Sequence, residues 1–351
     1  MTAQRPPSAP PPFPDVRSAF LLTIGAILAG GLIGVLFFDL GPLAADGIGT
    51  ALGIGGVATL AARRVAEPQA ARIGLVPLPL RAWPMILCLV PAVLLASELD
   101  NFAYDWSPKT EVAGDAEAGA ETGADAGTRA VEAEVAEVAD VADPAAIAEG
   151  GADGEPASET RPTAIAEAIA KAAAAAEAET PKPLVDPNDP FSLMEAFIVV
   201  VGIGPVIHEF LFRGVLQQGL VAQLGLMRGV TLASLLWTML RPPGLTSPAR
   251  FAAAFIAWFA LGWLLGMVRA ATGSILGSIL LASLWASIGF ASLALQDRVA
   301  LPGMNVDGTH LPIALTLASV LLVAWAGRRV LNEAREQVPG GDGSGRTAAG
   351  E

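Results

Sequence analysis

The sequence is poor in charge, in histidine and in cysteine, and each shortage narrows the classes of protein that it can encode. Only 16% of its 351 residues are charged, whereas an average soluble domain has about 25%. The single cysteine, Cys88, excludes an internal disulfide framework and any cysteine-rich metal site. Two histidines, His208 and His310, leave few ligands for a histidine-based metal site. We therefore expect neither a metal ion nor another cofactor.

The net charge of −13 is concentrated in one stretch. Residues 101–190 hold 20 acidic and 5 basic residues, which gives −15, and the other 261 residues hold 14 acidic and 16 basic ones, which gives +2. The sequence has no basic stripe, so we expect no nucleic-acid partner. Residues 98–190 are rich in Ala, Glu, Gly and Asp, and this composition predicts a disordered, low-complexity acidic loop.

Long apolar runs are what the sequence has in abundance: 53% of the residues are hydrophobic and the mean hydropathy is +0.55. A helix that spans a bilayer needs about 20 apolar residues. Runs of about that length, or slightly shorter, lie at 21–38, 47–62, 82–97, 191–207, 221–240, 251–268, 274–295 and 311–327. The pattern predicts an all-α, polytopic transmembrane helical bundle of about eight helices, which would contact membrane lipids.

These runs divide the chain into five predicted parts. They are a disordered Pro-rich N-terminus (1–18), the first three transmembrane helices (19–97), the acidic loop (98–190), a transmembrane core (191–330) and a flexible tail (331–351). Arginines lie before the first run, between the second and third, and after the last. By the positive-inside rule, both termini are then cytoplasmic and the acidic loop lies outside.

Three ionisable residues come together at the predicted end of the fourth span, in residues 204–218 (GPVIHEFLFRGVLQQ). An ionisable residue inside a span is costly and indicates a functional site. Glu209 and Arg213 are four residues apart, so they share one helix face and can pair. His208 points about 100° away from Glu209 on a helix. Position 212 is Phe, so the helix does not carry the two histidines of a zinc-binding helix.

This stretch resembles the first motif of the CPBP family, the CAAX protease and bacteriocin-processing intramembrane proteases, which reads Glu-Glu-x-x-x-Arg-Gly. The second Glu, the Arg and the Gly of the motif match Glu209, Arg213 and Gly214, whereas His208 replaces the first Glu. The resemblance covers about residues 190–295. It implies an eight-helix intramembrane endopeptidase fold with the core at 191–330, a bacterial inner membrane, and membrane-associated proteins or peptides as partners.

Two further segments carry the resemblance. Residues 72–74, before the third span, resemble the family's lead-in to its core. Residues 262–274 (GWLLGMVRAATGS) resemble its Gly-x-x-x-Gly helix, which ends in Thr-Gly-Ser.

The family's chemistry is glutamate-assisted peptide hydrolysis, as the resemblance implies. The first Glu and a His of the second motif activate water, while a His and an Asn or Asp of the third motif stabilise the oxyanion. The chain departs from this set: Arg241 stands where the second-motif His belongs, and Ala282 and Ala286 stand at the third motif. A register shift of one residue would place Ser283 and Ser287 there instead.

Three functions stay open on this basis. The favoured hypothesis is a pseudoprotease that binds membrane peptides or proteins, because a fold does not fix function once site residues are lost. The second is an active glutamic-type endopeptidase with a rewired centre of His208, Glu209, Arg213 and Arg241, in which the always-protonated Arg241 stabilises the oxyanion. The third is an unrelated, transporter-like protein whose ionisable residues line a polar path.

Each candidate residue also has a structural explanation. Glu209 and Arg213 can form a pair that needs no active site. Arg241 can anchor the following loop at the membrane interface, and His208 can face headgroup water. Packing or a place in the interfacial belt is expected for the tryptophans Trp237, Trp258, Trp263 and Trp285.

Overall fold

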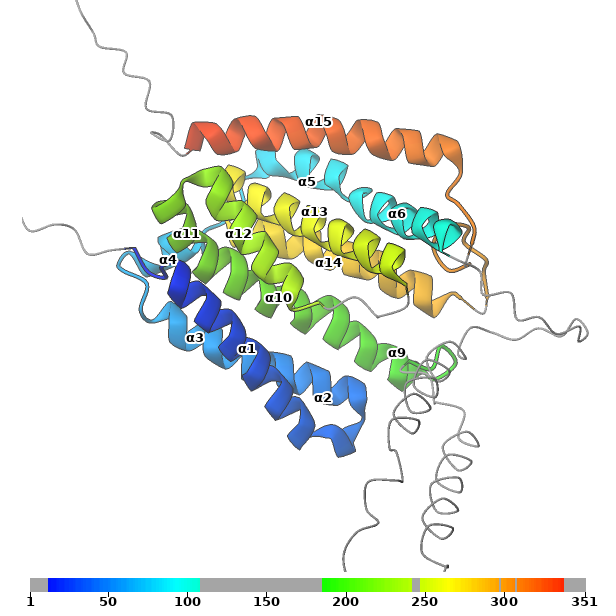
Figure 1. Ribbon diagram of the computed structural model, residues 1–351, viewed down its shortest axis with the longest axis horizontal. Coiled ribbons are helices and arrows are strands. Elements are labelled where there is room, and N and C mark those ends of the chain that lie inside the picture. The colour runs from blue at the N-terminus through cyan, green and yellow to red at the C-terminus, as the bar shows by residue number, and fades with distance from the viewer. Residues whose placement is uncertain (1–11, 108–184, 242–246, 297, 307, 338–351) are drawn as a thin grey trace, which may run out of the picture. The chain divides into compact units, whose positions relative to one another are not determined.

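Helices account for every regular element in the computed structural model, which describes residues 12–107, 185–241, 247–296, 298–306 and 308–337 (Figure 1). The all-α prediction is therefore confirmed for this part of the chain. Most of the predicted acidic loop, most of the Pro-rich N-terminus and the end of the predicted tail lie outside the described residues.

Short 3₁₀ segments (η1, η3) and π-helical segments (η2, η5, η6) join the α-helices into longer runs. In chain order the elements are α1 (Val16–Leu36), η1 (Phe38–Leu40), α2 (Pro42–Ile48), η2 (Gly49–Ile54), α3 (Gly55–Ala62), α4 (Gln69–Ile73), η3 (Leu80–Ala82), α5 (Trp83–Leu89), α6 (Ala92–Trp106), α9 (Pro190–Ala196), η5 (Phe197–Ile203), α10 (Gly204–Glu209), η6 (Phe210–Leu216), α11 (Gln217–Leu224), α12 (Leu226–Met239), α13 (Pro248–Thr272), α14 (Ile275–Ala294) and α15 (Ile313–Gln337).

Seven helical segments of the described chain are long and apolar enough to cross a membrane. They are Val16–Leu36, Pro42–Ala62, Leu80–Trp106, Pro190–Leu224, Pro248–Thr272, Ile275–Ala294 and Ile313–Gln337. An eighth helix, α12, is apolar but has only 14 residues. The predicted bundle of about eight helices is thus confirmed, and the chain is an integral membrane protein.

The predicted boundaries of the fourth and fifth spans were wrong. One helical run continues from Pro190 to Leu224, so the ionisable motif lies in its interior and not at its end. The chain turns at Gly225, whose φ of +81° suits glycine, and α12 follows at once. The helical run continues past the motif because the apolar residues that follow it are buried in the core. Leu211, Leu216 and Leu220 are all fully buried.

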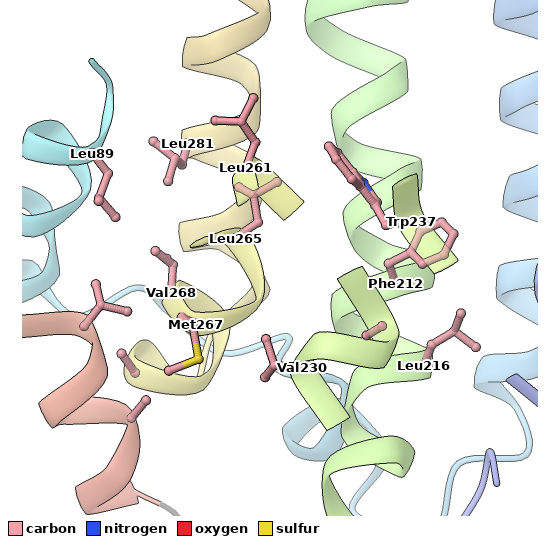
Figure 2. Packing of buried hydrophobic residues seen from close by; sticks show 14 of the residues in the cluster. Leu89, Phe212, Leu216, Val230, Trp237, Leu261, Leu265, Met267, Val268 and Leu281 are labelled. Carbon is pink, nitrogen blue, oxygen red and sulfur yellow. The ribbon is translucent and has the colours of Figure 1, made fainter. Parts of the chain in front are cut away.

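Helix α13 lies in the middle of the core and packs against α6, α12, α14 and α15 (Figure 1). Figure 2 shows the apolar cluster around it, to which α5, α12, α14 and η6 also contribute. Leu265 and Val268 of α13 are fully buried there. Lipid tails are as apolar as leucine, so such burial stabilises a membrane bundle by close packing.

Two glycines allow the close approach of α13 to its neighbours. A Cβ atom at Gly262 would lie 2.9 Å from the Trp237 ring, and one at Gly266 would lie 2.7 Å from Val230. Arg213 and Gln217 use this proximity, since they donate hydrogen bonds of 2.6 Å and 2.8 Å to the carbonyls of Gly262 and Gly266. The Gly-x-x-x-Gly pattern therefore brings the motif-bearing helix against α13.

The Thr-Gly-Ser sequence forms the turn between α13 and α14. Gly273 ends α13 with a φ of +70°, and the Ser274 side chain caps α14 by accepting from the Leu276 amide. The Ser274 hydroxyl also donates to the Val76 carbonyl at 2.6 Å, and the Ile275 amide donates to the Gly74 carbonyl at 3.0 Å. The lead-in segment before the third span is thereby tied to this turn.

Candidate functional site

The ionisable motif lies between two π-helical segments of the long helical run. His208 and Glu209 are the last residues of α10, with η5 before it and η6 after it. Wider turns of this kind occur frequently at functional sites. The two neighbouring side chains have different surroundings: His208 lines a cavity, whereas Glu209 is fully buried outside the cavity wall.

Glu209 and Arg213 form an ion pair inside the protein. The Arg213 Nε atom lies 3.4 Å from Glu209 Oε2, and both residues are 0% exposed. Arg213 also donates to the Gly262 carbonyl and lies 5.5 Å from the centre of the Trp237 ring. Neither charged residue lines the cavity, so the pair belongs to the packed core.

The cavity next to this pair has a volume of about 740 Å³ and mainly apolar walls. It is bounded by α1, α2, α10, the end of α12, α13 and α14. Its chemically informative lining residues are Asp46, His208, Trp237, Arg241, Trp258, Ala282 and Ala286. All four positions at which the chain departs from the family's motifs therefore lie in one cavity.

The side chains of His208 and Arg241 contact each other in this cavity. Arg241 Nη2 lies 3.4 Å from His208 Nδ1. A guanidinium group only donates hydrogen bonds, so Nδ1 carries the lone pair and Nε2 carries the proton of a neutral imidazole. The Arg241 guanidinium also lies over two indoles, with its Cζ 4.5 Å from the centre of the Trp237 ring and 4.9 Å from that of the Trp258 ring.

Of the two possible registers of the third motif, the unshifted one places both of its positions in the cavity wall. Ala282 and Ala286 are one turn apart on α14 and both line the cavity. Ser283 and Ser287 are not in the cavity wall, and the Ser287 hydroxyl donates to the Ser283 carbonyl at 2.7 Å. Methyl groups thus line the cavity at the two positions where the resemblance places the family's oxyanion-binding side chains.

The tryptophans fall into two groups. Trp237 and Trp258 form the clamp around Arg241, so this arginine lies in the cavity wall instead of anchoring a lipid-facing surface. Trp285 is buried and donates from Nε1 to the carbonyls of Leu89 and Val90 at 3.2 Å and 3.1 Å. It thereby donates to two carbonyls at the break between α5 and α6.

Sequence reasoning missed Asp46, an exposed residue of α2 at the rim of the cavity. The second span was predicted to begin at residue 47, which left Asp46 outside it. In the structure the span begins at Pro42, so Asp46 is an ionisable residue inside a membrane-spanning segment. With the correct boundary, the cost of such a residue would have marked it as a candidate.

A second cavity, of about 570 Å³, adjoins the central one and shares Val93, Trp258, Leu261 and Gly289 with it. An ion pair lies in its wall, in which Arg250 Nη2 is 2.7 Å from Asp100 Oδ2. The two chambers therefore have a common wall of small and apolar side chains with one indole.

His310 lies in the connection between α14 and α15 and joins it to α6. Its Nδ1 is 2.8 Å from Glu98 Oε1 and its Nε2 is 2.9 Å from Asp105 Oδ2. The hydrogen bonds to Asp105 and Glu98 raise the pKa of His310 above its ordinary value of 6.5. The predicted place of His310 in a loop is confirmed. His310 is far from His208 in sequence, and the two histidines share no contact partner.

In the described part of the chain, no three His, Cys, Asp or Glu side chains are placed to hold a metal ion. The expectation of no metal and no cofactor stays a prediction.

Comparison with known protein families gives one match: residues 190–288 match the family model described as Type II CAAX prenyl endopeptidase Rce1-like. Comparisons with curated proteins and with solved structures give no match. The matched residues run from the start of α9 to the cavity-lining turn of α14, so they include His208, Arg241 and Ala286.

Proposed function

Since residues 190–288 form a domain of the Rce1-like type II CAAX prenyl endopeptidase (CPBP) family, we propose that this protein uses the family's cavity to bind a segment of a membrane-associated protein without cutting it. The protein is then a pseudoprotease. Membership of this family disfavours the hypothesis of an unrelated, transporter-like protein.

One observation carries the proposal: the four positions that depart from the family's motifs line one cavity, and their side chains are unsuited to hydrolysis. A general base needs a free lone pair toward water. The lone pair of His208 Nδ1 faces the cationic Arg241, and the other ring nitrogen bears the proton. Ala282 and Ala286 offer no donor to an oxyanion.

Glu209 does not take over the role of base in this proposal. It is buried, it pairs with Arg213, and it lies outside the cavity wall. A carboxylate outside the cavity wall does not face a substrate held in the cavity. The match of Glu209, Arg213 and Gly214 to the motif therefore supports a shared architecture.

The test compares membrane-protein N-termini in cells that contain the protein, cells that lack it, and cells with Arg241→Gln or His208→Ala at equal abundance. We expect the same termini in all of them. Arg228→Gln is a matched control, because Arg228 is an exposed arginine on α12, outside the cavity. Termini that need the protein, Arg241 and His208, but survive Arg228→Gln, would mean that the protein is a protease.

The rewired endopeptidase is the second candidate, and a specific contact favours it. His208 and Arg241 do converge, and the clamped guanidinium is fixed in position as an electrostatic stabiliser must be. Asp46 at the cavity rim is the remaining carboxylate of the described lining. If this candidate is correct, Asp46→Asn will abolish the protein-dependent termini; if it is wrong, there will be none to abolish.

Restoring the family's residues tests whether the cavity still accepts a peptide. The restored chain combines His208→Glu, Arg241→His, Ala282→His and Ala286→Asn. We expect it to produce new N-termini in membrane proteins, because binding is kept and only the chemistry is missing. A chain that is folded but stays inert would count against peptide binding in this cavity.

We also propose the orientation in the membrane. Arginines near the second–third connection and after the last span favour cytoplasmic termini and an external acidic loop, which requires the short α12 to be the eighth crossing. A bacterial inner membrane is what the family resemblance implies. Reporter fusions after residue 337 and within the acidic loop give opposite signals if this orientation is correct.

A further inference from the structure

Arg241 differs from Arg213 and Arg269 because, among the described residues, no carboxylate or carbonyl oxygen contacts its guanidinium, although the carboxylates of Glu209 and Asp46 act on it from farther away. Arg213 pairs with Glu209, and Arg269 donates to the Arg72 carbonyl at 3.0 Å. Among the described residues, no carboxylate oxygen lies within 4 Å of the Arg241 guanidinium, and its polar contact is with His208. The sequence that follows it, PPGLT, contains no acidic residue.

A guanidinium at an apolar cavity wall is costly when no anion contacts it. Charges in such surroundings are normally paired, because the protein interior does not replace the water that they lose. The neutral imidazole of His208 supplies one lone pair, which leaves the other guanidinium donors facing the cavity. The cavity therefore favours an occupant that brings a negative charge.

The two indoles hold Arg241 ready for such an occupant. Trp237 is buried and meets Trp258 edge to face, with ring centres 6.1 Å apart. The guanidinium stacked on both has few orientations left to lose when it binds. A planar guanidinium can donate two parallel hydrogen bonds to a carboxylate, a geometry that suits both groups.

We propose that Arg241 binds the carboxylate of an apolar peptide in the central cavity. This inference rests on the proposed function, and it adds the chemical class of the ligand. The apolar walls suit the peptide's side chains, and the acidic Asp46 at the rim disfavours a second carboxylate. Hydrolysis of a peptide bond creates a terminal carboxylate, so a proteolytic reaction elsewhere is the class of reaction that supplies this ligand.

The test measures binding to the full chain in lipid nanodiscs at pH 8. The probes are two versions of one alternating alanine–leucine hexapeptide with an N-terminal fluorophore, one ending in a free carboxylate and the other in an amide. We expect the free acid to bind at least about 10-fold more tightly, as a charge-assisted hydrogen bond allows. In Arg241→Gln the preference should fall below about 2-fold, with Arg228→Gln unchanged.

A conservative variant keeps the test valid if Arg241→Gln does not fold. Arg241→Lys retains the charge but loses the planar fork and its stacking. It should keep a preference for the free acid, of smaller size than in the natural chain. Equal binding of acid and amide by the natural chain, or an unchanged preference in Arg241→Gln, overturns the inference.

A third probe, dodecanoate, separates this inference from the proposed function. Binding of the amide and the acid with equal affinity supports the peptide-binding function and overturns the carboxylate site. Arg241-dependent binding of dodecanoate without binding of either peptide overturns the peptide ligand, and with it the proposed function. If neither carboxylate binds up to millimolar concentration, Arg241 is no carboxylate site.

Discussion

His208 and Glu209 are neighbours in sequence, but each pairs with an arginine in a different kind of place. Glu209 meets Arg213 in the packed core, where both side chains are fully buried. His208 meets Arg241 in the wall of a cavity, where part of the guanidinium faces open space. The residues that match the family's motif are those of the core, and the residues that differ are those of the cavity.

This difference has a physical cause. Removing one partner of a buried ion pair leaves an uncompensated charge, whereas a side chain that faces a cavity can change without disturbing the packing around it. A match limited to the core residues is therefore evidence for the fold. It carries no information on whether the cavity hydrolyses a substrate.

Breaking the buried pair should have the largest effect on stability. Glu209→Gln leaves Arg213 charged and unpaired in the core, so we expect a loss of about 3–5 kcal/mol in the free energy of unfolding. The measurement is thermal or denaturant unfolding of the purified protein in detergent. Glu336→Gln, which changes an exposed glutamate of α15, is the matched control and should change little.

A double variant sharpens this prediction. Glu209→Gln combined with Arg213→Met removes both charges, so it should be less destabilised than Glu209→Gln alone. The control is Arg213→Met alone. If the double variant loses as much stability as the two single variants lose when their losses are added, the two charges do not stabilise each other.

Overpacking at Gly262, which lies next to both the buried ion pair and the cavity wall, should have the next largest effect on stability. A methyl group at Gly262 would meet the Trp237 ring at 2.9 Å and Arg213 Nη2 at 3.4 Å. We expect Gly262→Ala to cost about 1–3 kcal/mol of stability, as overpacking does, and to weaken carboxylate binding by displacing the indole that holds Arg241. Gly25→Ala on α1 meets open space and serves as the control. Normal stability and binding in Gly262→Ala would contradict the role of this contact.

His310 gives a smaller, pH-dependent effect, and it contrasts with His208 because its neighbours are carboxylates. The groups facing it are Glu98 and Asp105 of α6, together with the Phe102 ring. Its pKa is raised by Asp105 and Glu98, so its stabilising contribution is complete below 6.5 and is lost as the pH rises through the raised pKa.

Hydrogen exchange of the α14–α15 connection measures this effect. After correction for intrinsic rates, protection of the Leu311 amide, which donates to Glu98, should fall as the pH rises above 6.5. His310→Gln should remove the pH dependence, since glutamine does not titrate. A pH profile that is the same in both proteins would show that another group governs this connection. Because the His310 side chain is 36% exposed, salt should weaken the effect.

Much of the fold was predictable from local properties of the sequence. Apolar length predicted the helices, and the resemblance of residues 262–274 to the family's Gly-x-x-x-Gly helix placed the end of α13 at Thr-Gly-Ser. The end of the long run at Gly225 was not predicted, because the apolar residues continue on both sides of this glycine. The 14-residue α12 was consequently joined to part of the preceding helix.

The site was predictable only in part. Motif spacing located His208, Arg241, Ala282 and Ala286, which the structure brings to one cavity. The angle between His208 and Glu209 on a helix indicated that they diverge, but helix periodicity does not say which of the two faces the cavity. The stacking of Trp237 and Trp258 on Arg241 depends on how α12 packs against α13, and no local pattern encodes that.

The smallest expected effect on stability comes from an exposed ion pair on α15, which tests whether burial makes the Glu209–Arg213 pair important. Arg329 and Glu333 on α15 have the same four-residue spacing as the buried pair, and their atoms lie 3.0 Å apart, closer than in that pair. The Arg329 side chain is 45% exposed, so solvent screens the attraction. We expect Glu333→Gln to change stability by no more than about 0.5 kcal/mol, measured by the same unfolding assay as Glu209→Gln. If the two substitutions cost the same, spacing and distance would govern both pairs, and burial would not explain why Glu209 and Arg213 match the motif while the cavity residues do not.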